Sequence, residues 1–245
     1  MASEIESNER QWKSIYILGG VATIIGLVGI LLDVIMGNVT RGDLFALPQT
    51  SIDRFTQLHD NSLLGLYNFD LLNIINQIIL IPAYFALYAA HRKVNNAYAA
   101  FALIIFLTGT IIFVATNTAL PMLELSDKYF AATSETQKSF LAGAGEAMLA
   151  RGEHGSLGVF IGFTLPNIAD IIISFVMLRG KIFSKINSYL GIAGSSLMLI
   201  YLILVTFAPA TKNMATALAM PGGLIAMAWM IVFAIRLIRL GRKTD

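Results

Sequence analysis

The sequence predicts an all-α integral membrane protein, a single domain over residues 1–245 that forms a bundle of six transmembrane helices with short amphipathic helices on its outer face. Of its 245 residues, 56% are hydrophobic and only 13% are charged, and the mean hydropathy is +0.72. A soluble domain is usually about 25% charged, so this chain has too few charges to cover a surface that faces water. Most of its outside therefore faces the lipid bilayer.

The six helices are predicted from six apolar stretches, each long enough to cross a bilayer as a helix of about 20 residues. They are bounded by charged or turn-forming residues and cover approximately residues 14–36, 62–88, 98–122, 156–177, 188–207 and 215–238. The first stretch is too long for a signal peptide, and no small-residue cleavage site follows it, so we expect it to be retained as a span. Prolines at positions 82, 166 and 221 lie inside spans, where neighbouring helices can satisfy the carbonyl that each proline frees.

Small residues in these spans predict close helix packing. Glycine-lined faces let helices approach one another in lipid, and the chain supplies such faces at Gly19, Gly20, Gly26 and Gly29, at the Gly158–Gly162 GxxxG pair, and at Gly191, Gly194, Ser195 and Ser196. The same faces would suit a second membrane protein or another copy of the chain.

The distribution of Lys and Arg predicts the orientation. The side that holds both termini and the second and fourth connections carries eleven of these residues, against six on the other side, whose connections are longer. By the positive-inside rule, both termini lie in the cytoplasm of a multi-pass protein of the cell membrane. Tyr84, Tyr88, Tyr98 and Tyr189 then fall at the cytoplasmic boundary, as expected for an aromatic belt.

Two connections on the opposite side, residues 38–61 and 123–155, are too long for simple turns. The first predicts an amphipathic helix with Ser51 as its N-cap and Ile52, Phe55 and Leu58 at helical spacing. In the second, Ser134 and Gln137 form a capping box, and one apolar face is predicted from Phe140, Ala144, Ala147 and Met148. We expect both helices to lie on the outer surface, where they either cover a cavity or only pack against the membrane.

Three phrases resemble a known family: HRKVNNAYAAFALI, FLAGAGEAMLA and GFTLPNIADIIISFVMLRGKIFSKINSYLGIAG. The chain is similar to a prokaryotic family of uncharacterised six-helix integral membrane proteins, known as a domain of unknown function. The resemblance spans most of the sequence and implies the same membrane fold. It implies no activity, and it provides no active residues to transfer.

Candidate site residues come from polar side chains at membrane depth, where ionisable groups are costly and usually mark function. Asp33, Asp70 and Asp170 lie within predicted spans, and no Lys or Arg is expected at their depth. At about 100° per residue, Asp70 shares a helix face with two amides, and Asp170 shares another with Asn167 and Ser174. The predicted ligand-binding residues are Asp70, Asn73, Gln77, Asn117, Asn167 and Asp170. The alternative is that these groups form interhelical hydrogen bonds that only set the packing.

The two central aspartates are not expected to form a carboxylate pair. Asp70 and Asp170 lie on helices that run in the same direction, at different distances from the outer boundary. At 1.5 Å per residue, their depths differ by roughly 9 Å, whereas two carboxylates that share a proton must be almost in contact.

Histidines offer a second candidate site. His59 and His154 each precede a predicted span on the outer side and lie beside an acidic residue, so they could bind a metal ion such as zinc. Loop histidines are also commonly just hydrated, which is the expectation for His91 on the cytoplasmic side. No histidine lies within a span, which disfavours haem.

Three functions stay open. The first is binding or transport of a small or lipid-like ligand in a polar cavity between the second, third and fourth spans. The second is an accessory subunit whose glycine-lined faces contact another membrane protein or a second copy. The third is a membrane enzyme that acts on a lipid with Asp70 or Asp170 as acid or base, and the sequence favours a protein that is not an enzyme. No cofactor is indicated, the chain has no cysteine, and its scattered positive charge disfavours nucleic acid.

Overall fold

A computed structural model describes residues 2–37, 48–152 and 156–242, and these residues form α-helices and no strand. The α-helices are α1 (Ala2–Met36), α2 (Ser51–Asp60), α3 (Ser62–Asn68), α4 (Leu71–Thr116), α5 (Ala119–Ala131), α6 (Glu135–Gly152), α7 (Leu157–Arg179), α8 (Lys185–Phe207) and α9 (Lys212–Arg242). A short 3₁₀ turn, Pro209–Thr211, links α8 to α9. The all-α prediction is confirmed for this part of the chain.

Several helical segments are long and apolar enough to cross a membrane, as expected for a multi-pass protein. The five such segments in the described part of the chain are Trp12–Met36, Leu71–Ala131, Glu135–Arg179, Lys185–Phe207 and Asn213–Arg242. Two of the six predicted spans, 62–88 and 98–122, fall largely within the segment Leu71–Ala131. The number of crossings therefore depends on how that segment is folded.

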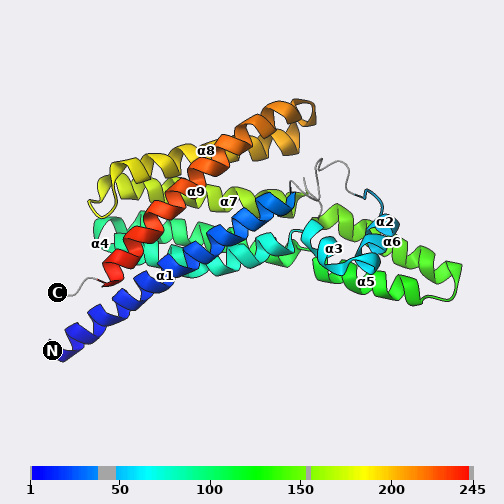
Figure 1. Ribbon diagram of the computed structural model, residues 1–245, viewed down its shortest axis with the longest axis horizontal. Coiled ribbons are helices and arrows are strands. Elements are labelled where there is room, and N and C mark those ends of the chain that lie inside the picture. Colours follow the sequence, from blue (N-terminus) through cyan, green and yellow to red (C-terminus); the bar gives the residue numbers. More distant parts are fainter. Residues whose placement is uncertain (1, 38–47, 153–155, 243–245) are drawn as a thin grey trace.

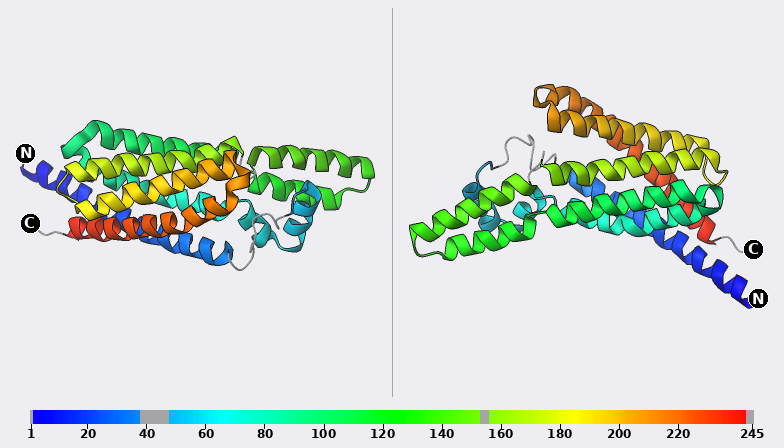
Figure 2. Two further views of the ribbon diagram at one scale, coloured as in Figure 1. Left: turned by 90° about the horizontal axis from the view of Figure 1, so that it is seen from above. Right: turned by 180° about the vertical axis from the view of Figure 1, so that it is seen from behind.

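The helix α4 is folded back on itself at Asn95, whose backbone is non-helical (φ −154°, ψ 88°). Tyr84 and Phe106 lie at equal distances along the chain from Asn95, and their rings stack with centroids 3.5 Å apart. The two halves of α4 therefore run side by side in opposite directions, as Figure 2 shows. The Asn95 side-chain oxygen accepts a hydrogen bond from the Tyr98 backbone N–H (3.3 Å), which caps the second half.

The first and last residues of α4 lie next to helix breaks, and these breaks fall inside two of the predicted spans. The span expected to begin at 62 is broken at Asp70, whose backbone is left-handed (φ 60°, ψ 22°). The span expected to end at 122 is broken after Asn117. The side-chain amide of Asn117 connects the two breaks. Its nitrogen donates to the Phe69 carbonyl (2.6 Å), and its oxygen accepts from the Ala119 backbone N–H (2.9 Å). The backbone groups that the breaks release thus find protein partners.

Five of the long helices form a ring. Neighbouring pairs in contact are α1 with α4, α4 with α7, α7 with α8, α8 with α9, and α9 with α1. The core inside this ring contains the buried side chains of Ala86, Leu87, Ile173, Met177, Trp229, Phe233 and Leu237. Both termini lie at the same end of the bundle as the Asn95 turn and the loop between α7 and α8 (Figure 1).

Glycines allow these helices to approach closely, as predicted. A Cβ atom at Gly20 would lie 2.9 Å from the Ala234 carbonyl oxygen, and one at Gly162 would lie 2.6 Å from the Phe113 Cβ. Gly158 likewise faces Thr116. The GxxxG pair of α7 therefore packs against the second half of α4 within the same chain.

At the end opposite the termini, α2, α3, α5 and α6 form a separate unit, here called the cap, from which α5 and α6 extend beyond the bundle (Figure 1). Its core is formed by Phe55 and Leu58 of α2, which are fully buried, with Phe69, Ala119, Met122 and Leu149. The Ser51 backbone N–H donates to the Glu146 carboxylate (2.6 Å), which joins α2 to α6.

Two details of the cap differ from the sequence predictions. The N-cap of α2 is Thr50 and not Ser51, because the Thr50 side chain accepts from the Asp53 backbone N–H. In α6, the apolar face predicted from Phe140 is not the face that packs against α2: Phe140 is 75% exposed, and the contact is made by Gly145, where an added Cβ would lie 2.6 Å from the Phe55 ring. A glycine contact, which hydrophobic periodicity does not register, determines which face of α6 is buried.

Close packing at glycine predicts a difference between two Gly→Ala variants. At Gly194, an added Cβ would lie 2.7 Å from the Ala226 backbone nitrogen, whereas at Gly143 nothing lies within 4 Å. We expect Gly194→Ala to lower the free energy of unfolding by about 1–3 kcal/mol. Gly143→Ala should leave it unchanged or raise it by up to about 1 kcal/mol, because alanine favours helix. Thermal unfolding midpoints in a neutral detergent test this, and equal midpoints for the two variants contradict it.

Candidate functional site

The most distinctive polar group within the bundle is the carboxylate of Asp170, one turn after Pro166 in α7. It accepts hydrogen bonds from the Tyr84 hydroxyl of α4 and from the Ser195 hydroxyl of α8, the latter at 3.1 Å. Ser195 is fully buried and Tyr84 is 6% exposed, whereas Asp170 is only partly buried. Two neutral donors from different helices therefore hold the carboxyl group of a residue that is itself only partly buried.

The environment of Tyr84 fixes the position of its hydroxyl. The Tyr84 ring lies almost parallel to the Phe106 ring (11° between planes), so α4 positions the phenol from both of its halves. The sequence placed Tyr84 in a belt at the membrane boundary, and the structure places it in the bundle interior. Tyr84 and Ser195 are thus the partners of Asp170 that sequence reasoning missed.

Further polar groups continue from Asp170 along the same helices. Ser174 lies one turn further along α7 and is fully buried. Among the described residues, the Ser174 hydroxyl and the Trp229 indole N–H of α9 have no hydrogen-bond partner, and both lie against Gly191 of α8, where a Cβ would clash with them. The interior around Asp170 therefore has unused hydrogen-bonding capacity.

Asp70 lies in a different part of the molecule, at the junction of the bundle and the cap. It is 3% exposed, and its carboxylate accepts from the Asn73 side-chain amide (3.2 Å). Tyr84, the partner of Asp170, follows Asp70 by fourteen residues of α4, which is about 21 Å of helix. The two carboxylates accordingly lie at different levels of the bundle.

Gln77 has a structural role. Pro166 has no backbone N–H, so it leaves the carbonyl of Gly162 without its usual partner in α7. The Gln77 side-chain nitrogen, on α4, donates to this carbonyl (3.2 Å). Gln77 thus compensates for the proline from the neighbouring helix.

The remaining predicted amides, Asn117 and Asn167, bond to backbone groups. Asn117 joins the two helix breaks, as described above. The side-chain nitrogen of Asn167 donates to the Phe163 carbonyl of its own helix (2.9 Å). Of the six predicted ligand-binding residues, the structure brings Asp70 and Asn73 together, but Asp170 bonds to residues outside the predicted set.

The metal prediction is not supported by a cluster of ligands. The ring of His59 is exposed and stacks on Phe130 with centroids 4.1 Å apart, and His154 lies outside the described residues. In the described part of the chain, no group of three or more His, Cys, Asp or Glu side chains is placed to hold a metal ion.

The expectation that His91 is hydrated is wrong. Its side chain is fully buried near the Asn95 turn, with Nδ1 2.8 Å from the Leu87 carbonyl and its ring stacked on Phe183. The loop between α7 and α8 covers it, which the sequence did not indicate.

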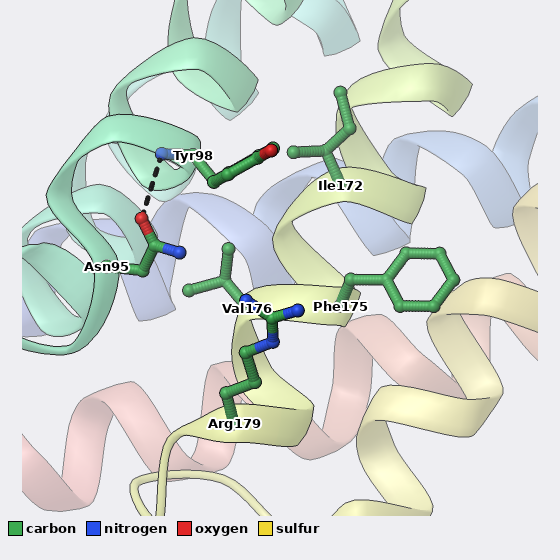
Figure 3. A pocket seen from close by; sticks show the side chains of 6 residues that line it. All are labelled: Asn95, Tyr98, Ile172, Phe175, Val176 and Arg179. Carbon is green, nitrogen blue, oxygen red and sulfur yellow. Dashed lines mark hydrogen bonds between the residues drawn. The ribbon is translucent and has the colours of Figure 1, made fainter.

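Two cavities lie at the end of the bundle that carries the termini. The first, of about 230 Å³, lies between the Asn95 turn and α7 and is lined by Asn95, Tyr98, Ile172, Phe175, Val176 and Arg179. Figure 3 shows the Arg179 guanidinium beside Val176 and Phe175. The second is larger, about 510 Å³, and lies between the α7–α8 loop and the end of α9.

The pairing of Gln77 with the proline-freed carbonyl predicts a coupled pair of substitutions. Gln77→Leu should lower the free energy of unfolding by about 1 kcal/mol or more, because the Gly162 carbonyl loses its donor. Pro166→Ala restores a backbone N–H within α7, so Gln77→Leu should cost less in that background. Unfolding of the four proteins in one detergent gives the coupling energy. An equal cost of Gln77→Leu in both backgrounds contradicts this role.

Comparison with known proteins identifies the family. Searches among curated proteins and among solved structures gave no match. A family profile described as a domain of unknown function, DUF4386, matches residues 15–241, which include all the long helices from α4 onward and the apolar part of α1. The chain therefore belongs to the DUF4386 family of proteins of unknown function.

Proposed function

We propose that this protein binds or transports a small or lipid-like ligand and that Asp170 is the centre of its site. The observation that carries the proposal is the carboxylate of Asp170, a partly buried residue, which is held by hydroxyls from α4 and α8. In the described part of the chain, no Lys, Arg or His side chain contacts it. The site lies between the first half of α4, α7 and α8, which is deeper in the bundle than the site expected around Asp70.

The cost of a carboxylate at this depth favours function over packing. Gln77 and Asn117 show that this chain uses amides where only a hydrogen bond between helices is needed. An asparagine at position 170 would serve that purpose at lower cost, because an ionisable group in lipid is expensive. A carboxyl group at position 170, in place of an amide, is explained if Asp170 exchanges a proton or binds a ligand that has hydrogen-bond donors.

Partial exposure of Asp170 favours a lipid-like ligand. Its neighbours on α7 include the partly buried Ile171 and Asn167. A ligand that enters sideways from the bilayer could place an apolar chain along this surface and a polar group at the carboxylate. Ser174 and Trp229 offer further donors behind it.

An enzyme is the second candidate, and the Tyr84–Asp170 contact favours it. General acid–base chemistry needs titratable groups within hydrogen-bond reach, and this phenol and carboxyl group meet that condition. Among the described residues, however, no histidine or second carboxylate joins them. The accessory-subunit alternative depended on free glycine faces, and Gly19, Gly20 and Gly194 contact helices of the same chain.

For the membrane arrangement, we propose six spans with both termini in the cytoplasm of a cell-membrane protein. Counting the two antiparallel halves of α4 separately gives six crossings, and both termini then lie on one side (Figure 1). The positive side chains of Lys93, Lys181, Arg239 and Arg242 lie at that end. This agrees with the positive-inside rule.

Fusions test this topology. A reporter that is active only in the cytoplasm should be active after Asp245 and inactive when inserted at Thr136, an exposed residue near the start of α6. Activity at Thr136 and not at Asp245 reverses the orientation, and activity at both positions excludes six spans.

A hydrophobic carbodiimide tests Asp170. Dicyclohexylcarbodiimide adds to protonated carboxyl groups that it reaches through lipid, so we expect an adduct on Asp170 in membrane vesicles, located by mass spectrometry. Asp170→Asn keeps the shape and the hydrogen bonds, and should remove the adduct without changing the unfolding midpoint. Ser195→Ala, which keeps the carboxyl group, is the matched control and should retain the adduct.

The same experiment can contradict the proposal. If Asp170 reacts only after the protein is unfolded, the carboxyl group is sealed inside the bundle and acts in packing alone. A large loss of stability in Asp170→Asn leads to the same conclusion.

A further inference from the structure

A basic groove lies at the end of the bundle that carries the termini, far from Asp170. It is the cavity of about 510 Å³ between the α7–α8 loop and the end of α9. Its polar lining includes Lys181 and Ser184 of the loop and Arg236 and Arg239 of α9. Its apolar lining includes Val232 and Ile235, which are 40% and 44% exposed.

The positive charge of this groove is not neutralised by the described part of the chain. No Asp or Glu is among the residues that line it, and Lys181, Arg236 and Arg239 form no ion pair with any described residue. Arg236 uses its Nε–H to hold the loop, by donating to the Ile182 carbonyl (2.7 Å). An arginine has five N–H donors, so most of its hydrogen-bonding capacity remains for another acceptor.

The start of α8 adds backbone donors to the same region. Ser184 is the N-cap of this helix, and its hydroxyl oxygen accepts from the Asn187 backbone N–H (3.2 Å). The N–H groups of Lys185 and Ile186, in the first turn, have no partner within the helix. Such a helix start favours anions, which adds to the attraction of the three cations.

The expected span boundaries place the groove at the depth of lipid headgroups. Arg236 and Arg239 flank the expected end of the last span, and Tyr189, 60% exposed on α8, is of the type that marks membrane interfaces. Val232 lies one turn deeper on α9, on its exposed side. Cations at the membrane interface, with exposed apolar side chains one turn deeper, are complementary to a molecule that has an anionic head and a hydrocarbon tail.

We propose that this groove binds the phosphate-bearing headgroup of an anionic phospholipid in the leaflet at this end of the bundle. Lys181, Arg236 and Arg239 hold the phosphate, and Val232 and Ile235 contact the start of an acyl chain. Basic pockets between transmembrane helices bind anionic headgroups in this way. The site is separate from the one proposed at Asp170, so either can fail without the other.

Native mass spectrometry of the whole protein in a neutral detergent tests the proposal, with phosphatidylglycerol as the probe and phosphatidylcholine for comparison. Lys181→Gln with Arg239→Gln removes two exposed cations of the groove and leaves Arg236 to hold the loop. Lys93→Gln with Arg242→Gln removes two exposed cations at the same end but outside the groove, which makes it a control of equal charge. Unfolding midpoints of both double variants establish that they are folded.

We expect the groove variant to bind phosphatidylglycerol about 25-fold more weakly than the unmodified protein, from about 1 kcal/mol for each cation at 1.4 kcal/mol per tenfold. Lys181→Gln alone should weaken binding about 5-fold by the same conversion. The control variant should bind as the unmodified protein does, and phosphatidylcholine should bind weakly to all of them.

Other outcomes overturn the proposal. Equal losses in the two double variants mean that the lipid is attracted by overall charge and not by the groove, and no loss in either means that the groove binds no headgroup. Equal binding of phosphatidylcholine to the unmodified protein means that anionic charge is not recognised. If millimolar inorganic phosphate displaces phosphatidylglycerol, the groove is a site for free phosphate and not for a lipid.

Discussion

The need to satisfy the backbone polar groups that its helices release inside a lipid-facing bundle accounts for several of the buried amides of this protein. In hydrocarbon, no water can serve a carbonyl or N–H that a helix releases. This chain interrupts its helices at Asp70, Asn95 and Asn117, and it places Pro166 inside α7. A side-chain amide serves the released backbone groups at several of these points, as in the bond from Gln77 to the Gly162 carbonyl. Gln77 and Asn117 therefore serve backbone groups released by Pro166 and by the helix breaks, and these two amides need no ligand to explain them.

Satisfaction of backbone groups does not explain Asp170. Its carboxylate serves no released backbone group, and its partners are hydroxyls that would bond equally well to an amide. The structural explanation that applies to Gln77, Asn117 and Asn167 does not extend to it. We therefore place the proposed site at Asp170, where a carboxyl group is more than packing requires.

The sequence predicted the features that depend on composition and on local spacing. Long apolar stretches indicated the spanning helices, small residues indicated the close contacts, and the Ser134 cap of α6 is present, with its hydroxyl accepting from the Gln137 N–H (3.3 Å). The exact ends of the helices, and so the depth of each residue along its helix, were harder to predict from the sequence. The first half of α4 continues to the turn at Asn95, beyond the expected end at 88. That shift of about six residues moves Tyr84 roughly 9 Å deeper, from an interface into the interior beside Asp170.

The sequence also did not predict which face of a helix contacts its neighbour. For α6, an apolar face was predicted from Phe140 and Ala144, but its contact with α2 is made through Gly145. Periodicity counts hydrophobic side chains, whereas a glycine contact depends on a neighbour that is far away in the sequence. His91 was misjudged for a similar reason, because its covering residue, Phe183, lies on a distant loop.

The ring of helices closes between α1 and α9, and this closure has a consequence for biosynthesis. Gly20 of α1 contacts Ala234, and Gly241 of α9 contacts Ile17, so the helix made early in translation packs against the one made late. Until α9 has entered the membrane, the small-residue face of α1 that receives it is exposed to lipid or to other insertion intermediates. The ribosome must therefore finish almost the whole chain before this contact can form.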